Sequence, residues 1–443
     1  MNVLPLLRAR RDHLSNARAT RAELQRRQLA KFRHLAAFLV QRSPHYRDII
    51  ADRRIDVRTC VPGDFPVLTK TDLMANFDRI VTDPGITKRG VQEFFTASQN
   101  PFDLYRGRYI ALHTSGSSGE TGFFVYSQDD WMRGLAQALR AAPPSLAKRR
   151  VAFFGATQGH YAGVSMTVTS RRWPLSLLYD VATFEINRPV AEAVDGLQRF
   201  RPNILIGYPS CLAILAEKQR RGALRLSPQH IQTSGEPVQA ADRKAIEEAF
   251  GVPLTNVYSC TEHMLMGLSR ADLGGMYLME DDLIFDLAAD HMLVTNLFNR
   301  TLPMIRYRMN DRLTAIADTV NAFPFTKVAE VVGRSEQVPL FVNRRGEDDF
   351  VSPAMIVEYQ VPNVRTHQLQ RLSATECVMR ICLAPSLGSA ERDAAVREAH
   401  SRLGAILAQK DMQNVTFRIE VREDLRPDPR TGKFKLIVGP DSP

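Results

Sequence analysis

Residues 113–122 read HTSGSSGETG and directly follow the apolar segment RYIAL at 108–112. Glycines let backbone N–H groups approach a ligand closely, and Ser and Thr hydroxyls add hydrogen-bond donors without bulk. The stretch therefore favours a loop that binds an anion, with phosphate as the first candidate. It is not a Walker A loop, because Gly122 is followed by Phe123 and Phe124 where that motif needs Lys. A solvated Ser/Gly turn on the surface is the alternative.

Short apolar segments alternate with helical patterns from residue 108 onward. The apolar segments are RYIALHT (108–114), VAFFGA (151–156), NILIGY (203–208), HIQTSG (230–235) and PLTNVYS (253–259). The helical patterns lie at 129–142, 211–224 and 239–250. This alternation predicts an α/β fold with mostly parallel sheets, in which ligands bind at the carboxyl ends of the strands.

Two changes of pattern divide the rest of the chain. Residues 275–318 alternate apolar and polar side chains between turn signals, which predicts antiparallel strands and a β-rich subdomain. After residue 333 comes a tail of about 110 residues, long enough for a small α+β domain. We expect a large N-terminal domain at 1–334, with a basic helical start at 1–60, and a small C-terminal domain at 335–443.

The composition is that of a globular protein, with 44% hydrophobic and 24% charged residues. Five cysteines are scattered without a C-x-x-C pair, which favours reduced thiols over a disulfide framework or a zinc site. No stretch approaches the roughly 18 apolar residues of a transmembrane helix, and the first apolar run is too short for a signal peptide. We therefore expect a cytoplasmic protein without a membrane partner.

The formal net charge of +10 is concentrated at the N-terminus, where residues 1–54 hold thirteen Lys and Arg against four acidic residues. Apolar residues recur in this segment at helical spacing: Leu24, Leu29, Phe32, Leu35, Phe38 and Leu39. The pattern predicts an amphipathic helix with a basic outer face. We favour a solvated face over a patch for RNA, membrane or an acidic partner, since no RNP or zinc-finger pattern supports binding of nucleic acid.

Five short stretches at predicted loops carry further chemistry. They are TSGSSGETG (114–122), TSGEP (233–237), VYSCTE (257–262), IRYRMND (305–311) with VVGRSE (331–336), and PRTGKFK (429–435). Their order and spacing resemble the adenylate-forming superfamily of acyl-CoA synthetases, peptide-synthetase adenylation domains and luciferases. Four other stretches resemble its phenylacetate-CoA ligase-like branch, which includes capsule-biosynthesis adenylating proteins: SPHYRDI (43–49), FPVLTK (65–70), GYPS (207–210) and LPMIRYR (302–308). The resemblance runs from about residue 40 to 438.

This resemblance implies a two-step ligase that uses ATP and Mg²⁺. A carboxylate attacks the α-phosphate, giving an acyl-adenylate and pyrophosphate, and a second nucleophile then takes the acyl group. Negative charge develops on phosphate oxygens during the attack, so positioned N–H donors, Mg²⁺ and a Lys would stabilise the transition state.

The resemblance also implies that the glycine-rich loop holds the β- and γ-phosphates, with Thr114 catalytic. The ATP-binding residues in the loop are then Ser115, Gly116, Ser117, Ser118, Gly119, Thr121 and Gly122. Many relatives carry Lys near the end of this loop, whereas this chain has Glu120 and Thr121. Since a carboxylate beside triphosphate is repulsive, we expect the loop to bind phosphate through backbone and hydroxyl groups more than through a cation.

The other motifs imply the rest of the nucleotide site. The segment along adenine is matched by Ser234, Gly235, Glu236 and Pro237. Tyr258 matches an aromatic that stacks on the base, and Ser259 and Thr261 belong to the same ATP-binding stretch. Without the resemblance, Glu236 could cap the following helix and Tyr258 could be core.

The resemblance also implies charged residues that bind the metal, bind the ribose and form the hinge. Glu262 matches the catalytic residue that ligates Mg²⁺. Asp311 matches the acid that accepts both ribose hydroxyls, and Arg334 the residue that reaches the ribose or phosphate. Glu336 takes the hinge position. Lys433 matches the catalytic lysine of a small mobile domain, which bridges the carboxylate and the α-phosphate; a Lys in a surface turn is the alternative.

The identity of the two substrates is left open by the sequence. His160, Tyr208, Phe153 and Cys260 are candidates for a pocket that takes an aromatic acid. A catalytic pair of Cys260 with His263 is disfavoured, because Cys-x-x-His alone is a weak signal. The acyl acceptor is CoA, a carrier protein or an amine, and a homodimer is also left open. A degenerate, non-catalytic nucleotide-binding protein is the other alternative.

Overall fold

The fold is given by a computed structural model, which describes residues 2–114, 121–141, 147–329, 338–357, 359, 361–425 and 436–439. No helix in these ranges is long and apolar enough to cross a membrane. The predicted boundary between the domains at 334/335 lies outside them, so the division at that point stays a prediction. We call residues 2–329 the large lobe and residues 338–439 the C-terminal lobe.

An eight-stranded sheet forms the centre of the large lobe, in the order β13-β9-β8-β7-β6-β5-β3-β4. Its strands are β3 (Arg149–Gly155), β4 (Tyr179–Glu185), β5 (Ile204–Gly207), β6 (His230–Ser234), β7 (Leu254–Cys260), β8 (Met264–Arg270), β9 (Gly275–Leu278) and β13 (Lys327–Val328). Strands β4, β3, β5, β6 and β7 run parallel, and the others are antiparallel. The predicted α/β class is confirmed.

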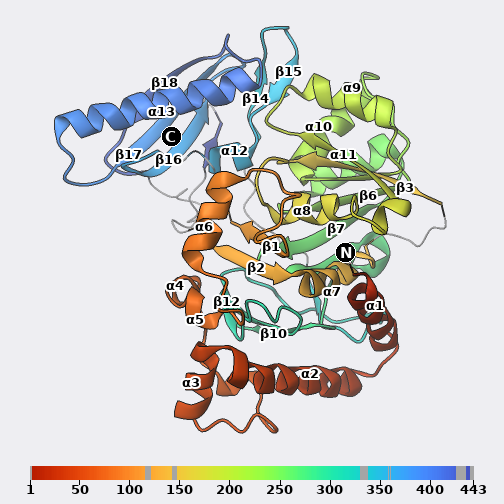
Figure 1. The fold of residues 1–443 in the computed structure, drawn as a ribbon. Helices are drawn as coiled ribbons and strands as arrows, with labels where there is room; N and C mark the ends of the chain where they lie inside the picture. The colour runs from red at the N-terminus through yellow and green to blue at the C-terminus, as the bar shows by residue number, and fades with distance from the viewer. Residues whose placement is uncertain are drawn as a thin grey trace.

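Helices cover both faces of this sheet, because successive side chains of a strand point to opposite faces. On β3, Phe154 belongs to the buried cluster formed with α9 (Val190–Phe200), α10 (Pro209–Arg220) and α11 (Ala240–Phe250). Its neighbour Phe153 packs on the other face with Val164 and Val168 of α8 (Ala162–Thr169). Figure 1 shows these helices around the strands of the central sheet. The parallel strands therefore end at one common edge, and the sequence motifs follow β6 and β7 there.

The glycine-rich loop joins two antiparallel strands, β1 (Tyr109–His113) and β2 (Phe123–Ser127). The sequence pattern instead passes from the loop to a helix, and α7 (Gln128–Ala138) begins only after β2. The short run FFVYS forms a strand because its first four residues are buried and pair with β1. The predicted β-rich region contains β9 and the three-stranded sheet of β10 (Leu283–Leu287), β11 (Met292–Asn296) and β12 (Tyr307–Met309).

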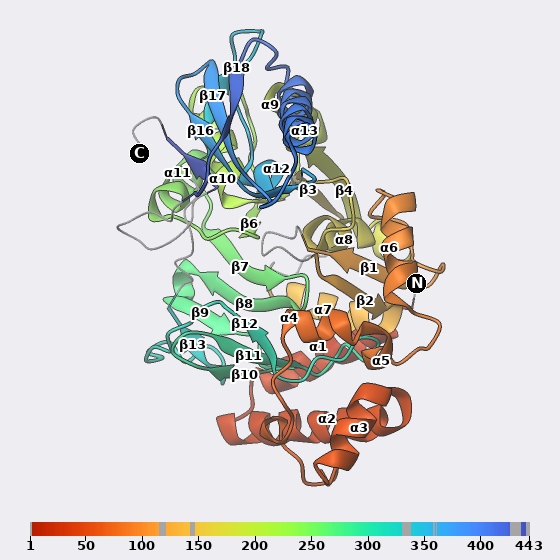
Figure 2. The same ribbon diagram turned by 90° about the vertical axis from the view of Figure 1, so that its left-hand side faces the viewer.

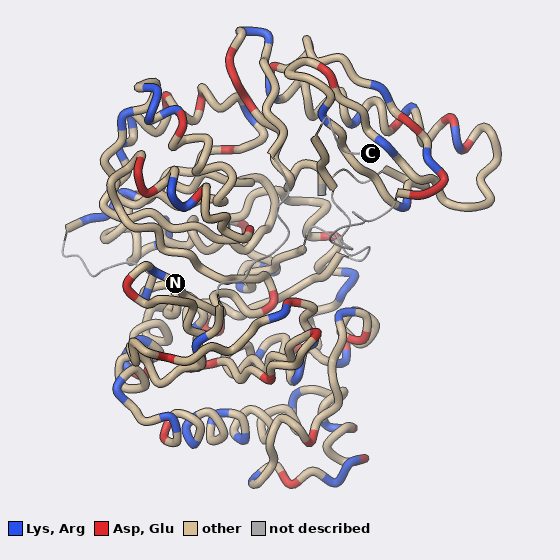
Figure 3. Tube along the Cα trace, turned by 180° about the vertical axis from the view of Figure 1, so that it is seen from behind, with Lys and Arg blue, Asp and Glu red and all other residues tan. Residues whose placement is uncertain are grey.

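Helices surround the N-terminal end of the large lobe: α1 (Leu4–Asn16), α2 (Arg21–Arg42), α3 (Pro44–Asp52), α4 (Lys70–Ala75), α5 (Phe77–Ile80) and α6 (Lys88–Ala97). Helix α2 is the predicted basic amphipathic helix, and its buried face includes Leu24, Phe32 and Leu35. Figure 3 shows Lys and Arg spaced along this helix at the base of the molecule.

The basic face of α2 is not wholly solvated, because it meets three buried acids, Glu280, Asp281 and Asp282, which we call the acid triplet. Lys31 Nζ lies 2.6 Å from Asp282 Oδ1, and His13 Nε2 lies 2.8 Å from Asp282 Oδ2. Burial opposes ionisation of Asp282, but the charges of Lys31 and His13 hold its pKa well below its usual value. Part of the N-terminal positive charge therefore stabilises the fold.

The C-terminal lobe has its own buried cluster, all of it between Phe341 and Ile437. Its elements are β14 (Leu340–Val342), β15 (Asp348–Phe350), α12 (Pro353–Val357), β16 (Val364–Arg371), β17 (Glu376–Leu383), α13 (Ser389–Gln409), β18 (Thr416–Val421) and β19 (Ile437–Val438). Helix α13 lies against the sheet β18-β17-β16-β19. Figure 2 shows this lobe, in blue, at the opposite end of the molecule from α2 and α3.

A buried ion pair of the C-terminal lobe is hydrogen-bonded to the backbone of the large lobe. Lys410 follows α13, and its Nζ lies 2.8 Å from Asp349 Oδ1, with both side chains 0% exposed. The same ammonium group donates to the backbone oxygens of Ile186 (2.9 Å) and Arg188 (2.7 Å) in the large lobe. Asp349 Oδ2 accepts from the backbone N–H of Val190 at 2.9 Å. One lysine and one aspartate thus hold the start of α9 against the end of α13.

Candidate active site

The structure describes both ends of the glycine-rich loop, Thr114 and Thr121–Gly122, while Ser115–Glu120 lie outside the described residues. The backbone N–H of Thr114 donates to the Gly122 carbonyl at 3.0 Å, and the Gly122 N–H donates to Thr114 Oγ1 at 2.9 Å. These two bonds close the loop at its base. The Thr114 hydroxyl is therefore held at the carboxyl end of β1.

A cation that the sequence analysis did not assign lies at the base of this loop. Lys70, the first residue of α4, places its Nζ 3.2 Å from Thr114 Oγ1. A Cβ on Gly122 would come within 2.9 Å of Lys70 Cε, so the side chain of Lys70 runs along the end of the loop. The site consequently contains a positive charge contributed from a different part of the chain.

Glu262 lies in the turn between β7 and β8. Burial raises the pKa of its carboxyl group, the charge of Lys70 lowers it, and Asp311 raises it. The hydroxyl of Tyr126 on β2 contacts the backbone oxygens of Thr261 (2.8 Å) and Glu262 (2.7 Å). The turn that carries Glu262 is thereby attached to the hairpin that carries the glycine-rich loop.

The residues expected to bind adenosine lie next to one another. Tyr258 OH donates to Asp311 Oδ2 at 2.8 Å, and burial followed by the charge of Asp311 raises the pKa of this phenol well above its usual value. In the central sheet Ser234 pairs with Val257, which puts the segment predicted to lie along adenine beside Tyr258. The strand β7 has a register shift between Tyr258 and Ser259. The predicted base and ribose ligands therefore share one edge of the sheet.

Gly235 and Glu236 lie on the side of this segment that faces α10. Gly235 has φ +84°, and a Cβ there would lie 3.0 Å from the ring of Tyr208. Glu236 Oε2 accepts from the backbone N–H of Ser210 at 3.3 Å. Glu236 therefore caps the start of α10.

Two of the four candidates for the acid pocket are in contact. The rings of Phe153 and Tyr208 meet edge to face, with centroids 6.4 Å apart. His160 is 2% exposed and packs against Phe94, with ring centroids 4.7 Å apart. Burial lowers the pKa of His160 to about 4, so the imidazole is neutral at pH 7. Among the described residues its Nε2 has no hydrogen-bond partner.

Cys260 has the properties of an inert thiol. Burial and the charge of Glu262 raise its pKa well above the usual value, and its Sγ accepts from the backbone N–H of His263 at 3.3 Å. Burial lowers the pKa of the His263 imidazole to about 3. A pair in which His263 activates Cys260 is therefore excluded by the positions of both groups, since the backbone of His263 and not its ring contacts the sulfur.

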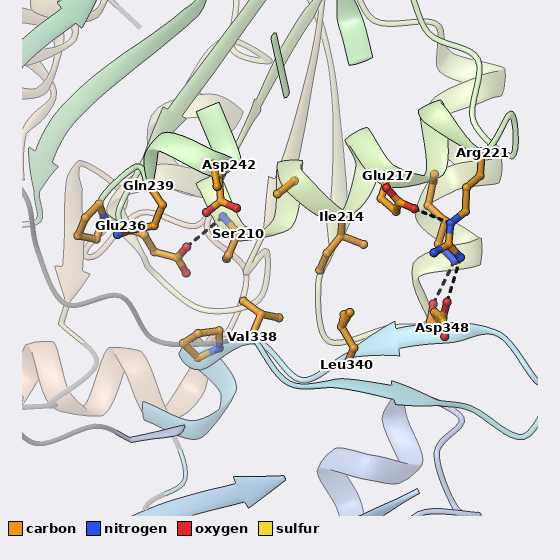
Figure 4. A pocket seen from close by; sticks show the side chains of 15 residues that line it. Ser210, Ile214, Glu217, Arg221, Glu236, Gln239, Asp242, Val338, Leu340 and Asp348 are labelled. Atoms are coloured by element: carbon orange, nitrogen blue, oxygen red, sulfur yellow. Dashed lines mark hydrogen bonds and ion pairs between the residues drawn. The ribbon is translucent and has the colours of Figure 1, made fainter. Parts of the chain in front are cut away.

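A cavity of about 500 Å³ lies between α10, α11 and the β14–β15 hairpin, where the two lobes meet. Figure 4 shows Glu236, Ser210 and Asp242 at one end of it, and an ion-paired group of Glu217, Arg221 and Asp348 at the other. Of the predicted site residues that the structure describes, Glu236 and Pro237 line it. The cavity therefore borders the segment predicted to lie along adenine.

Several predicted residues lie outside the described part of the chain. They are Lys433, Arg334, Glu336 and the loop residues Ser115, Gly116, Ser117, Ser118 and Gly119. Their assignments stay predictions. Two residues near the site were missed, Lys70 and Tyr126; the stretch FPVLTK contained a signal for the first, because it ends on that lysine.

Comparison with known proteins finds relatives of one kind. The chain is 25% identical over 387 residues to the phenylacetate-coenzyme A ligase of Escherichia coli K12, an alignment that covers 74% of this chain and 82% of that protein. The similarity is to the phenylacetate-CoA ligase-like branch of the adenylate-forming superfamily. No protein-family model matches the chain.

Two further similarities cover a short segment and nearly the whole chain, respectively. Over 124 residues the chain is 24% identical to the indoleacetate–lysine synthetase of Pseudomonas savastanoi, covering 27% of this chain and 31% of that protein. The structure of 2-hydroxyisobutyryl-CoA ligase in complex with 2-HIB-AMP and CoA in the thioesterification state superposes with a TM-score of 0.63 at 18% identity. That match covers 96% of this chain and 91% of the ligase, and it shows that the two share a fold.

Proposed function

We propose that this protein is an ATP-dependent ligase that converts an aromatic carboxylic acid to its acyl-adenylate and passes the acyl group to CoA or another thiol. The observation that supports this best is the convergence of Thr114, Glu262, Tyr258 and Asp311. Tyr258 donates to Asp311, and Glu262 follows Tyr258 by four positions in the chain. The backbone oxygen of Glu262 accepts from Tyr126 on β2, and β2 pairs with β1, which leads to Thr114. In the proposed site, the Thr114 hydroxyl would contact the phosphates and the Glu262 carboxylate would bind the metal. The ring of Tyr258 would stack on the base, and the Asp311 carboxylate would accept the ribose hydroxyls.

Mg²⁺ fits this site through Glu262. No group of three or more His, Cys, Asp or Glu side chains in the described ranges could hold a metal, but Mg²⁺ bound with a nucleotide needs only one or two carboxylates, because phosphates and water complete its shell. The half-buried carboxylate of Glu262 meets that requirement. The ion would supply positive charge to the phosphate oxygens when bound.

An aromatic acid is favoured by the side chains around the candidate pocket. Phe153 and Tyr208 present an edge-to-face pair, and His160 is a neutral, buried imidazole that can donate a hydrogen bond to a carboxylate without adding charge. CoA is the acceptor named for the relatives that align over most of the chain. The indoleacetate–lysine synthetase, whose name gives an amine acceptor, is the reason to keep amide formation as the second candidate.

Carboxylate-dependent exchange of pyrophosphate into ATP tests the first step. We expect exchange with at least one acid from a panel of aryl and fatty acids, and its near loss in Lys433→Ala. Exchange with none of the acids would contradict the proposal and favour a non-catalytic nucleotide-binding protein. Trapping the adenylate with CoA, a phosphopantetheinylated carrier protein, lysine or hydroxylamine then identifies the acceptor.

A further inference from the structure

The glycine-rich loop is unusual in lacking a cation. Residues 113–122 contain no Lys or Arg, and the loop ends on Glu120, Thr121 and Gly122. In the proposed site the triphosphate would share its surroundings with the carboxylates of Glu262 and Asp311. Backbone donors and hydroxyls alone would then have to offset the charge of the triphosphate and of two carboxylates.

Lys70 stands where the missing charge is needed. Its ammonium group lies 3.2 Å from the hydroxyl of Thr114, at the base of the loop, and its stem passes Gly122. One ammonium group therefore lies at the base of the loop, next to the residues that close it.

The backbone around Lys70 is fixed. Thr69 caps α4, since its Oγ1 accepts from the backbone N–H of Asp72 while its own N–H donates to the Asp72 carboxylate. The preceding residue, Leu68, exchanges two backbone hydrogen bonds with Arg306 and Arg308, on either side of β12 residue Tyr307. A lysine at the first position of a helix held in this way does not depend on the loop for its placement.

We propose that Lys70 binds the β- and γ-phosphates of ATP, and pyrophosphate as it leaves, in place of a lysine within the loop. The inference rests on the proposed function. In adenylation a carboxylate oxygen bonds to the α-phosphorus while the bond from that phosphorus to the bridging oxygen breaks. The bridging oxygen leaves with the electron pair as part of pyrophosphate, and Lys70 stabilises that charge without transferring a proton.

The test separates a polyphosphate contact from a structural role. Binding of ATP, pyrophosphate and AMP is measured by calorimetry for wild type, Lys70→Met, Lys70→Gln and Lys70→Arg. A charge-assisted hydrogen bond of ~1.5–3 kcal/mol corresponds to about a 10- to 100-fold loss of affinity. We expect that loss for ATP and pyrophosphate in the Met and Gln variants, a change of less than about 3-fold for AMP, and partial recovery in Lys70→Arg.

Lys88→Gln is the matched control, because Lys88 is also half-buried, begins α6 and donates to the Met74 carbonyl of α4 at 3.0 Å. Its affinities should equal those of wild type. Unchanged ATP affinity in Lys70→Met, or an equal loss of ATP and AMP affinity, would overturn the role of Lys70 while leaving the proposed function intact. A wild-type protein that binds no ATP would overturn both.

Discussion

Replacing Lys410 by Met should destabilise the junction between the lobes by about 3–5 kcal/mol, because removal of one partner leaves a buried charge unpaired. Asp349 is fully buried, and its carboxylate would keep only the Val190 N–H and its local backbone as donors. The backbone oxygens of Ile186 and Arg188 would each lose a donor as well. The methionine side chain fills similar volume, so the loss is one of charge and hydrogen bonds.

The double variant Lys410→Met with Asp349→Leu separates this cause from a packing defect. Since apolar side chains of similar volume often replace a buried ion pair at little cost, the double variant should recover most of the stability. A two-lobed chain need not unfold in one step, so amide hydrogen exchange at residues 186–190 and in α13 is followed together with the denaturant midpoint. Lys244→Met, which breaks an exposed pair with Glu248 on α11, should change stability by less than about 0.5 kcal/mol. A single variant as stable as wild type, or a double variant as unstable as the single, would refute the reasoning.

Three further outcomes follow from the site and the core. Asp311→Asn should weaken ATP binding by about 10- to 100-fold, because the amide accepts the Tyr258 hydroxyl but loses the charge that binds ribose; unchanged affinity in calorimetry would remove Asp311 from the nucleotide site. Gly122→Ala should lower the exchange activity and reduce the free energy of unfolding by about 1–3 kcal/mol, since its Cβ would lie 2.8 Å from the buried ring of Phe124. Full activity would show that the base of the loop adapts. Asp282→Asn should reduce the free energy of unfolding by about 3–5 kcal/mol near neutral pH. The pKa of Asp282 is lower in the folded state than in the unfolded state, so its contribution to stability is present above the unfolded pKa of about 4 and is lost as pH falls. The unfolding free energies of the two proteins in urea should therefore approach each other in acid. A constant difference between them down to pH 3 would contradict this.

The central sheet could be predicted because its signals are local. Apolar segments such as VAFFGA alternate with helical patterns, and Thr69 followed by Asp72 gives the capping box that begins α4. The order of the loop motifs then indicated Glu262, Tyr258 and Asp311, which the fold brings together.

What the sequence did not reveal depends on contacts between distant segments. Lys70 meets Thr114 across 44 positions and Lys31 meets Asp282 across 251, and neither helix carries a pattern that specifies its partner. Lys410 is buried against the backbone of Ile186, which lies 224 positions away in the chain. The strand β2 was missed because five residues are too few to distinguish a buried strand from the start of a helix.

The hydroxyl of Tyr126 gives the hairpin and the turn after β7 a common anchor. A nucleotide that draws the loop toward its phosphates would pull on β2, and the pull would reach the peptide groups of Thr261 and Glu262 directly. Binding of a nucleotide and the position of the Glu262 side chain are in this way coupled. The substitution Tyr126→Phe, which removes one phenolic oxygen, would let the hairpin and the turn after β7 move independently.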